Sequence, residues 1–83
     1  MTAAEAARRA AEHAAREAYG RLVAYLAYRW GDLAAAEDAL ADAFERALTT
    51  WPRDGVPAVP DAWLMTAAKR RLMEAARQRR VRE

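Results

Sequence analysis

Several residue types that support catalysis or metal binding are absent from this 83-residue chain, or nearly so. Cysteine does not occur, which excludes disulfides, thiolate metal ligands and a thiol nucleophile. Histidine occurs once, at His13, in an Ala/Arg/Glu-rich stretch where a solvated helix residue is far commoner than a metal ligand. A glycine-rich phosphate loop and carboxylates paired around a cleft are missing too. We therefore expect no enzyme, no catalytic residue, no metal and no cofactor.

Long apolar runs are also absent. No run approaches the roughly 18–20 apolar residues that a membrane-spanning helix requires. The first residues, Met1 to Arg9, lack the apolar stretch of a signal peptide. The sequence therefore predicts a cytoplasmic protein with no membrane partner. A chain of this length buries only about 60–65% of its unfolded surface, so we expect one domain, residues 1–83, with a small core.

Glycine and proline are scarce, with three of each, and they divide the chain. Gly31-Asp32 is typical of a helix stop followed by an N-cap, because glycine adopts a left-handed backbone and aspartate accepts from free N–H groups. All three prolines lie in residues 51–60, which therefore cannot be helical throughout, and Pro60 fits the first turn of another helix. The sequence predicts an all-α fold, a small three-helix bundle with a Pro/Gly-containing loop between helices two and three. The expected helices span about 3–30, 33–51 and 60–80.

Each expected helix has an apolar stripe at helical spacing. The stripe of the second helix consists of Leu33, Ala36, Leu40, Phe44, Ala47, Leu48 and Trp51. Trp30 and Trp63 fall on the stripes of the other two helices, and we interpret them as core residues. The first half of the first helix is mostly Ala, Arg and Glu, so we expect it to fray.

Charge is distributed unevenly along the chain. From Lys69 to Glu83 there are seven basic and two acidic side chains, whereas residues 1–68 carry seven basic and ten acidic ones. A cationic segment beside an acidic body is typical of a protein that binds a polyanion, most often nucleic acid. A solvated basic helix end is the alternative, because basic residues also complement a helix C-terminus. The outward side of the third helix carries Lys69, Arg70, Arg77 and Arg80.

The second helix has an acidic face opposite its apolar stripe. Asp38, Asp42 and Glu45 follow i, i+4, i+7 spacing. Such a face either keeps the domain soluble or docks on a basic partner, and the spacing alone leaves both interpretations open. Tyr25 and Tyr28 point away from the stripe of the first helix, as interface anchors do.

Three segments, in order, resemble a known family. Ala-Glu-Asp-Ala-Leu-Ala-Asp-Ala-Phe stands at 36–44, and Trp-Pro-Arg-Asp-Gly-Val-Pro follows at 51–57. Pro-Asp-Ala-Trp-Leu-Met-Thr-Ala-Ala-Lys-Arg-Arg completes the set at 60–71. Their order and spacing resemble region 2 of bacterial RNA polymerase sigma factors of the extracytoplasmic-function type. Closest is the subgroup with a Trp-Pro-x-x-Gly-x-Pro loop before an Ala-Trp-Leu helix. The resemblance extends from about Tyr19 to Arg80.

The resemblance implies a transcription initiation domain that docks on the RNA polymerase core. In that family the second helix binds the clamp helices of the largest subunit through an Asp-x-x-Gln-Glu-x-Phe pattern. The pattern falls here on Asp38, Ala41, Asp42 and Phe44, and Glu45 extends the acidic face. Ala41 stands where the family usually has Gln, which removes one polar contact with the clamp.

The resemblance also implies recognition and opening of the promoter −10 element. Family members hold the non-template strand after the duplex opens, with one base unstacked into a pocket of the loop. Loop 52–60 is then the expected pocket, with Arg53 and Asp54 as its polar side chains, although a rigid helix connection is the plainer interpretation. The expected contacts to phosphates or to the upstream duplex are Lys69, Arg70, Arg77 and Arg80. Glu74 is expected to pair with an arginine of the first or third helix.

Family members also have a second helical domain that reads the −35 element through a helix-turn-helix, and nothing in this sequence resembles it. We expect an excised fragment, because the chain stops in a basic run where a linker normally starts; a complete short product is the alternative. The promoter sequence, inducing signal, regulatory partner and oligomeric state stay open.

A second class of function also stays open. A protein-interaction module, for example a domain bound by an anti-sigma factor, would need no DNA contact of its own. A membrane-surface helix at 69–82 ranks last, because its apolar face has too few large residues to insert.

Overall fold

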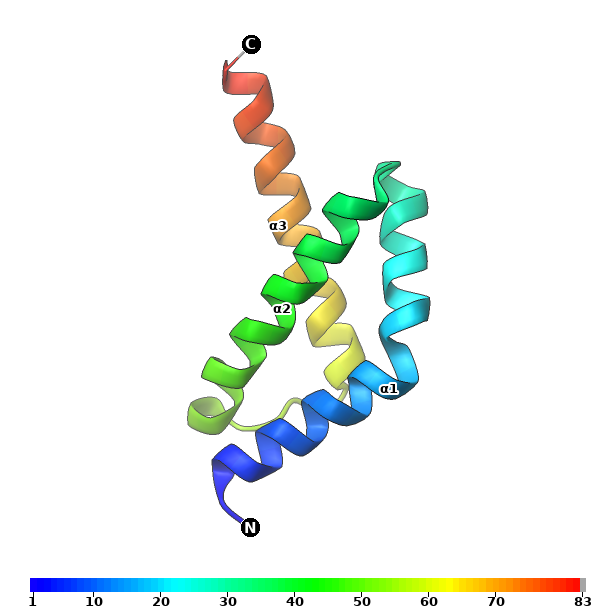
Figure 1. Ribbon diagram of the computed structural model, residues 1–83. Coiled ribbons are helices and arrows are strands. Elements are labelled where there is room, and N and C mark those ends of the chain that lie inside the picture. The colour runs from blue at the N-terminus through cyan, green and yellow to red at the C-terminus, as the bar shows by residue number, and fades with distance from the viewer. Residues whose placement is uncertain (83) are drawn as a thin grey trace.

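The computed structural model describes residues 1–82, which form three α-helices joined by two short connections (Figure 1). The helices are α1 (Ala3–Trp30), α2 (Leu33–Asp54) and α3 (Pro60–Arg82). α1 and α2 run antiparallel, and α3 packs across both while its last turns project beyond them (Figure 1). The predicted all-α three-helix bundle is confirmed. Among the described helices, none combines the length and the hydrophobicity that crossing a membrane requires.

The turn between α1 and α2 has the geometry that its sequence predicts. Gly31 has φ 69°, and its N–H donates to the Ala27 carbonyl at 2.7 Å. The Asp32 carboxylate then accepts from the Ala35 N–H at 3.0 Å and caps α2. This left-handed glycine followed by an aspartate cap reverses the chain within two residues.

The first half of α1 is ordered into the bundle, and the expectation that it frays is wrong. Its first turn is closed by a capping box, in which the Thr2 hydroxyl accepts from the Glu5 N–H at 3.1 Å and the Glu5 carboxylate accepts from the Thr2 N–H at 3.2 Å. That backbone hydrogen bond from Thr2 lowers the pKa of Glu5. The buried alanines of this half are Ala7, Ala11, Ala14 and Ala18. Small side chains at this spacing let two helices approach closely, so large apolar residues are not needed to hold the segment.

α1 changes direction near its middle (Figure 1). The buried face moves with the bend, from the alanine stripe to Leu22 and Leu26. Gly20 is an exposed residue within α1, and glycine is a common site of helix bending. Both halves of α1 therefore contribute buried residues to the core.

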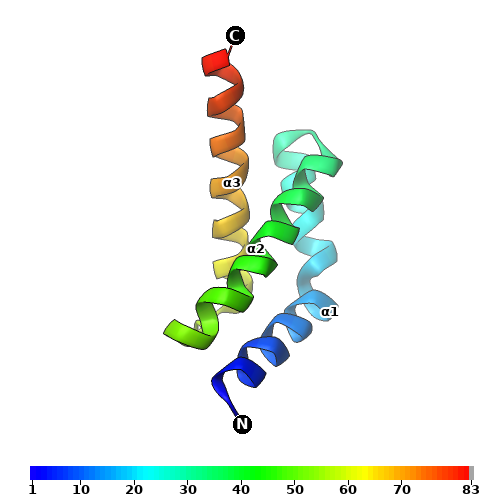
Figure 2. The same ribbon diagram turned by 60° about the vertical axis from the view of Figure 1, so that its left-hand side comes forward.

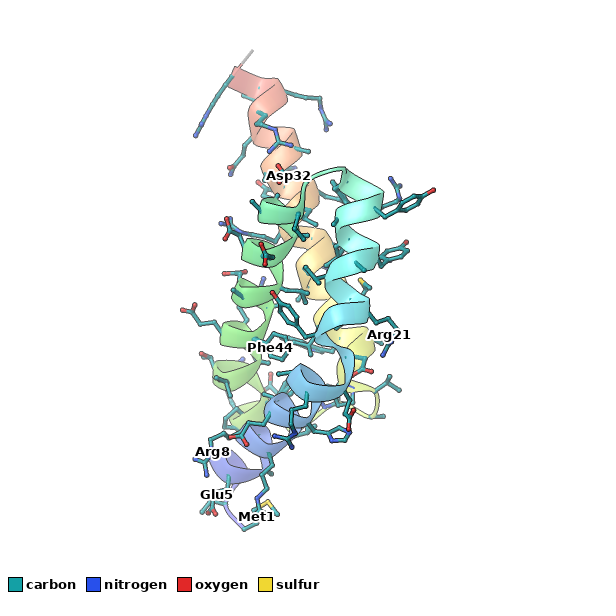
Figure 3. The ribbon with its side chains drawn as sticks, turned by 45° about the vertical axis from the view of Figure 1, so that its right-hand side comes forward. Met1, Glu5, Arg8, Arg21, Asp32 and Phe44 are labelled. Carbon is teal, nitrogen blue, oxygen red and sulfur yellow. The ribbon has the colours of Figure 1, made fainter. Side chains whose placement is uncertain are left out.

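The buried face of α2 differs from the predicted stripe. It consists of Ala36, Ala39, Leu40, Ala43, Ala47 and Trp51. Leu33 and Leu48 were expected in the core but are 58% and 48% exposed. α2 lies between two helices, so the face with the small side chains turns inward and Leu48 turns outward. Phe44 lies at the margin, where it is directed toward α1 and its ring centroid is 6.4 Å from that of Tyr19 (Figure 3).

α2 also ends later than predicted. It continues through Pro52 to Asp54, and the Gly55 N–H closes it by donating to the Trp51 carbonyl at 2.8 Å. A proline removes one backbone hydrogen bond, but only the last turn follows it here and Trp51 anchors that turn in the core. The connection is therefore residues 55–59 rather than 52–60. Pro60 begins α3 as predicted.

Candidate nucleic-acid and protein interfaces

The acidic stripe of α2, which we define as Asp38, Ala41, Asp42 and Glu45, lies on the outward side of the helix. Asp42 is half-buried and the other three residues are exposed. None of the three carboxylates forms an ion pair with another residue of the described chain. The stripe therefore presents uncompensated negative charge to a partner.

A hollow lies between α2, the connection and the start of α3. Its lining consists of Arg46, Pro57, Val59, Ala62, Trp63, Thr66, Ala67 and Arg70. We call it the loop groove. Its volume of 460 Å³ falls within the roughly 300–1,000 Å³ of small-ligand sites. The lining combines apolar side chains with one arginine from α2 and one from α3, which suits a flat apolar group carrying a nearby negative charge.

Trp63 is the aromatic wall of the loop groove. It is half-buried, and it meets Trp51 edge to face with ring centroids 5.4 Å apart and planes at 71°. Trp51 is only 1% exposed, and its indole Nε1 has no hydrogen-bond partner among residues 1–82. An edge-to-face pair of this kind holds both rings in a defined orientation. Trp63 packs against the core, as expected, and its remaining surface lines the groove.

A second hollow, which we call the basic groove, lies between the end of α1 and the outer half of α3. Its lining consists of Arg29, Trp30, Arg70, Met73, Glu74, Ala76, Arg77 and Arg80. The Arg29 guanidinium lies over the Trp30 ring, 5.2 Å from its centroid. Trp30 is half-buried and packs against the core, as expected, while its remaining surface lines this groove. Arg70 lines both grooves and connects them.

The predicted cations of α3 do not all have the same surroundings. Arg77 donates to Glu74, which confirms the expected pairing of that carboxylate and lowers its pKa. Lys69 is half-buried, with its ammonium 5.2 Å from the ring centroid of Tyr25. Arg70 and Arg80 are exposed and form no ion pair within the described chain. Among the four, these two arginines are the most available to a phosphate.

Lys69 is one of two polar links between α3 and α1. The other is the ion pair of Arg21 with Asp61, at 3.0 Å, and Figure 3 shows Arg21 on the side of α1 that faces the start of α3. Tyr25 and Tyr28 are exposed, as predicted, at 44% and 88%. Tyr25 thus contacts α3 through Lys69, whereas Tyr28 has no such contact among residues 1–82.

Arg53 and Asp54 differ from their predicted place. They lie in the last turn of α2 rather than in the connection, and neither lines the loop groove. Arg53 donates to both carboxylate oxygens of Asp54, at 3.0 and 3.2 Å. The hydrogen bonds lower the pKa of Asp54 and raise that of Arg53. The Asp54 carboxylate, which was expected to accept from a base, therefore already accepts from Arg53.

Five lining residues of the loop groove were missed from the sequence, and three of them, Arg46, Trp63 and Thr66, carry a ring or a polar group. Trp63, Thr66 and Arg70 stand at i, i+3 and i+7, so one face of α3 carries an aromatic ring, a hydroxyl and a cation. That spacing is a usable signal. Arg46 has no comparable signal, because it reaches the groove only through the packing of α2 on α3.

Residues 15–82 match the family model of Sigma-70 region 2. No curated protein and no solved structure shows a significant match to the chain. The matched residues include the acidic stripe and both grooves. The chain therefore belongs to the Sigma-70 region 2 family, a domain of transcription initiation factors that acts on core RNA polymerase and promoter DNA.

Proposed function

We propose that this chain is region 2 of a bacterial sigma factor of the extracytoplasmic-function type, acting in the cytoplasm. In this proposal the acidic stripe docks on the clamp helices of the largest polymerase subunit, and the two grooves hold the −10 element. The observation that carries it is a pair of surfaces of opposite charge on different helices, neither neutralised by the other. An acidic face on α2 and arginine-lined grooves along α3 can bind two partners at once.

For the polymerase, the acidic stripe supplies steering and register, because complementary charge guides encounter and disfavours wrong partners. Ala41, in the middle of the stripe, offers a flat apolar contact in place of an amide. Leu48 lies seven residues further along the same side of α2 and adds exposed apolar surface. This apolar area supplies affinity that the screened charges do not.

For the promoter, the loop groove takes one unstacked base of the non-template strand. Unstacking costs a few kcal/mol, and stacking on an aromatic side chain returns about 1–3 kcal/mol. Trp63 offers such a ring, while Pro57 provides a wall whose backbone is ordered in advance. Thr66 and Arg46 are the polar groups within reach of the base edge or its phosphate. They take the role that was expected of Arg53 and Asp54.

The strand continues from the loop groove into the basic groove over Arg70, which lines both. Arg80 neutralises a further phosphate, and Arg77 does so less effectively because Glu74 already accepts from it. Lys69 acts on DNA only indirectly, since its ammonium lies over Tyr25. Each phosphate contact on a single strand should contribute about 0.7 to the salt dependence of binding.

Capture of the core polymerase tests the docking half of this proposal. The native domain should be retained by immobilised core enzyme, and the variant Asp38→Lys/Asp42→Lys should bind at least about tenfold more weakly, because charge reversal places like charges together. Glu12→Lys/Glu17→Lys is the matched control, with the same change of charge on exposed residues of α1. Failure of the native domain to bind, or equal binding by both variants, overturns the docking assignment.

The alternative of an interaction module without DNA contact rests on Tyr28, which is 88% exposed and lies outside both grooves. A −10 single-stranded oligonucleotide separates the two functions. Binding that weakens in Arg70→Glu/Arg80→Glu supports the DNA-binding function. If the native chain does not bind the oligonucleotide but still binds the core polymerase, the interaction module is supported.

A further inference from the structure

We infer that residues 1–14, which precede the part that matches the family model, brace the loop groove from behind. The inference rests on the proposed function, because it assigns these residues a task in holding the base-binding wall. They touch no DNA in this arrangement. They act through Trp51, which is the positioning residue.

Residues 1–14 lie beside the last turns of α2. α1 and α2 leave the turn at Gly31-Asp32 with the same rise per residue, so residues equally far from the turn lie side by side. Ala14 is then level with about residue 49, and Ala11 with about residue 52. All three views show the first turns of α1 beside the last turns of α2 (Figures 1, 2 and 3).

Trp51 needs this cover. It stands at the start of the last turn of α2, where a bundle normally opens to solvent, and yet it is only 1% exposed. Trp63 covers one edge of the ring. The matched part of α1 begins at residue 15, level with about residue 48, so it stops short of Trp51. Ala7, Ala11 and Ala14 are buried in the same cluster as Trp51, and we assign them the remaining cover because this part of α1 lies beside the last turns of α2.

Trp51 reaches the loop groove by two routes. Its ring supports Trp63, the aromatic wall, at 5.4 Å between centroids. Its carbonyl accepts from the Gly55 N–H at 2.8 Å and so sets where the connection leaves α2. Pro57 and Val59 of that connection form the opposite wall. A shift of Trp51 therefore moves both walls together.

The segment is built to stay in place. The capping box of Thr2 and Glu5 starts its helix, and an ion pair of Arg8 with Glu12, at 3.6 Å, spans its second and third turns. Its inner face is alanine, which allows close approach to α2 at a small cost in side-chain entropy.

Deletion of residues 1–14 is the primary test, with the affinity for a −10 single-stranded oligonucleotide and for core polymerase both measured. We expect the oligonucleotide affinity to fall at least about tenfold. The core affinity should change less than about threefold, because the acidic stripe ends at Glu45, before the part of α2 that lies beside residues 1–14. Arg9→Ala is the control variant, since this side chain is exposed, is not part of the buried alanine face, and should leave both affinities unchanged.

Amide hydrogen exchange of the native chain is the second measurement, and it needs no variant. Addition of the oligonucleotide should slow exchange in residues 3–14 at least about threefold, although these residues do not touch it. Protection confined to the connection and α3 overturns the brace.

The outcomes separate the two proposals. If the native chain does not bind the oligonucleotide, the proposed DNA function fails and the brace fails with it. Equal oligonucleotide binding by the native and shortened chains overturns the brace alone. If the shortened chain loses both partners through unfolding, the exchange measurement on the native chain decides.

Discussion

The two arginine-rich ends of this domain, the first half of α1 and the last half of α3, have opposite surroundings. In α1, an alanine at every third or fourth position lies in the core, so the helix is held along its length. In α3, none of the described residues after Leu72 is buried, and the last turns project from the bundle (Figure 2). Spacing of small apolar residues, rather than arginine content, decides which end packs and which stays open to a partner.

Their charges differ in use as well. In α1, Glu5 closes the capping box and Glu12 pairs with Arg8, so carboxylates support the helix itself. In α3, Glu74 pairs with Arg77, and Arg80 remains exposed. The carboxylates of the α1 end therefore serve the fold, whereas the α3 end keeps exposed cations, which the proposed function assigns to DNA.

The largest expected effect is a difference in stability between two variants, each with a carboxylate added at one of the two ends. Ala14→Glu places a charge at a buried position against α2 and should lower the free energy of unfolding by about 3 kcal/mol or more. Val81→Glu makes a similar change at an exposed position of α3 and should stay within about 0.5 kcal/mol. Urea unfolding followed by circular dichroism measures both. Similar losses for the two variants would contradict the difference between the ends.

Charge reversal should weaken DNA binding when it is made in α3 but not when it is made in the first half of α1. Arg70→Glu/Arg80→Glu should weaken binding of a −10 single strand about 10–100-fold and reduce the salt slope by about 1.4, because two phosphate contacts are lost. Arg9→Glu/Arg16→Glu carries the same change of charge and should cost less than about threefold in 0.15 M salt, where charges beyond roughly 8 Å are screened. Fluorescence anisotropy at several salt concentrations gives both quantities. An equal effect of the two double variants would mean that net charge, not the grooves, controls binding.

A smaller effect is expected at Gly20 of α1. Gly20→Ala should raise the free energy of unfolding by about 0.5–1 kcal/mol, because alanine favours helix and restricts the unfolded chain. A Cβ at this position meets no atom within 4 Å, so no packing opposes the change. Thermal unfolding should show an increase of several degrees. A decrease would show that the bend depends on glycine rather than on the packing of the two halves.

The smallest expected effect is a pH dependence at the packed end. The pKa of Glu5 is lower in the folded chain than in the unfolded chain. The ionised carboxylate therefore stabilises the fold at pH values above the usual pKa of a glutamate. That contribution is lost as the pH falls through the lowered folded value. Glu5→Gln should therefore be slightly less stable than the native chain at pH 7 and equally stable in strong acid. Unfolding curves across this range, with Glu17→Gln as the control for the change of charge, test the direction.

Local signals predicted the elements of the fold well. Gly31, Asp32 and Pro60 act on their own backbone, so the turn and the two helix starts were readable in order. The end of α2 was not, because a proline there is tolerated only when Trp51 anchors the last turn. The burial of the first half of α1 was missed for a related reason. An alanine stripe has little apolar area by itself, and it acquires a role only against a partner helix.

The candidate site also has parts that local sequence signals predicted and parts that they did not. Periodicity alone placed the acidic stripe on the outward side of α2 and Arg70 on the outward side of α3. The loop groove was not predictable, because it combines Arg46 from α2 with Trp63 from α3 and the connection between them. Arg53 and Asp54 were assigned to a loop that begins only after them.

The sequence by itself determined the number of helices, their order, their family and the separation of acidic from basic residues. Each of these follows from the spacing and type of neighbouring residues along one chain. The tertiary structure alone decided which alanines are core, which tryptophans line grooves and which arginines remain unpaired. Those outcomes depend on the distance and angle between helices, and close approach between side chains remote in sequence decides burial and ion pairing.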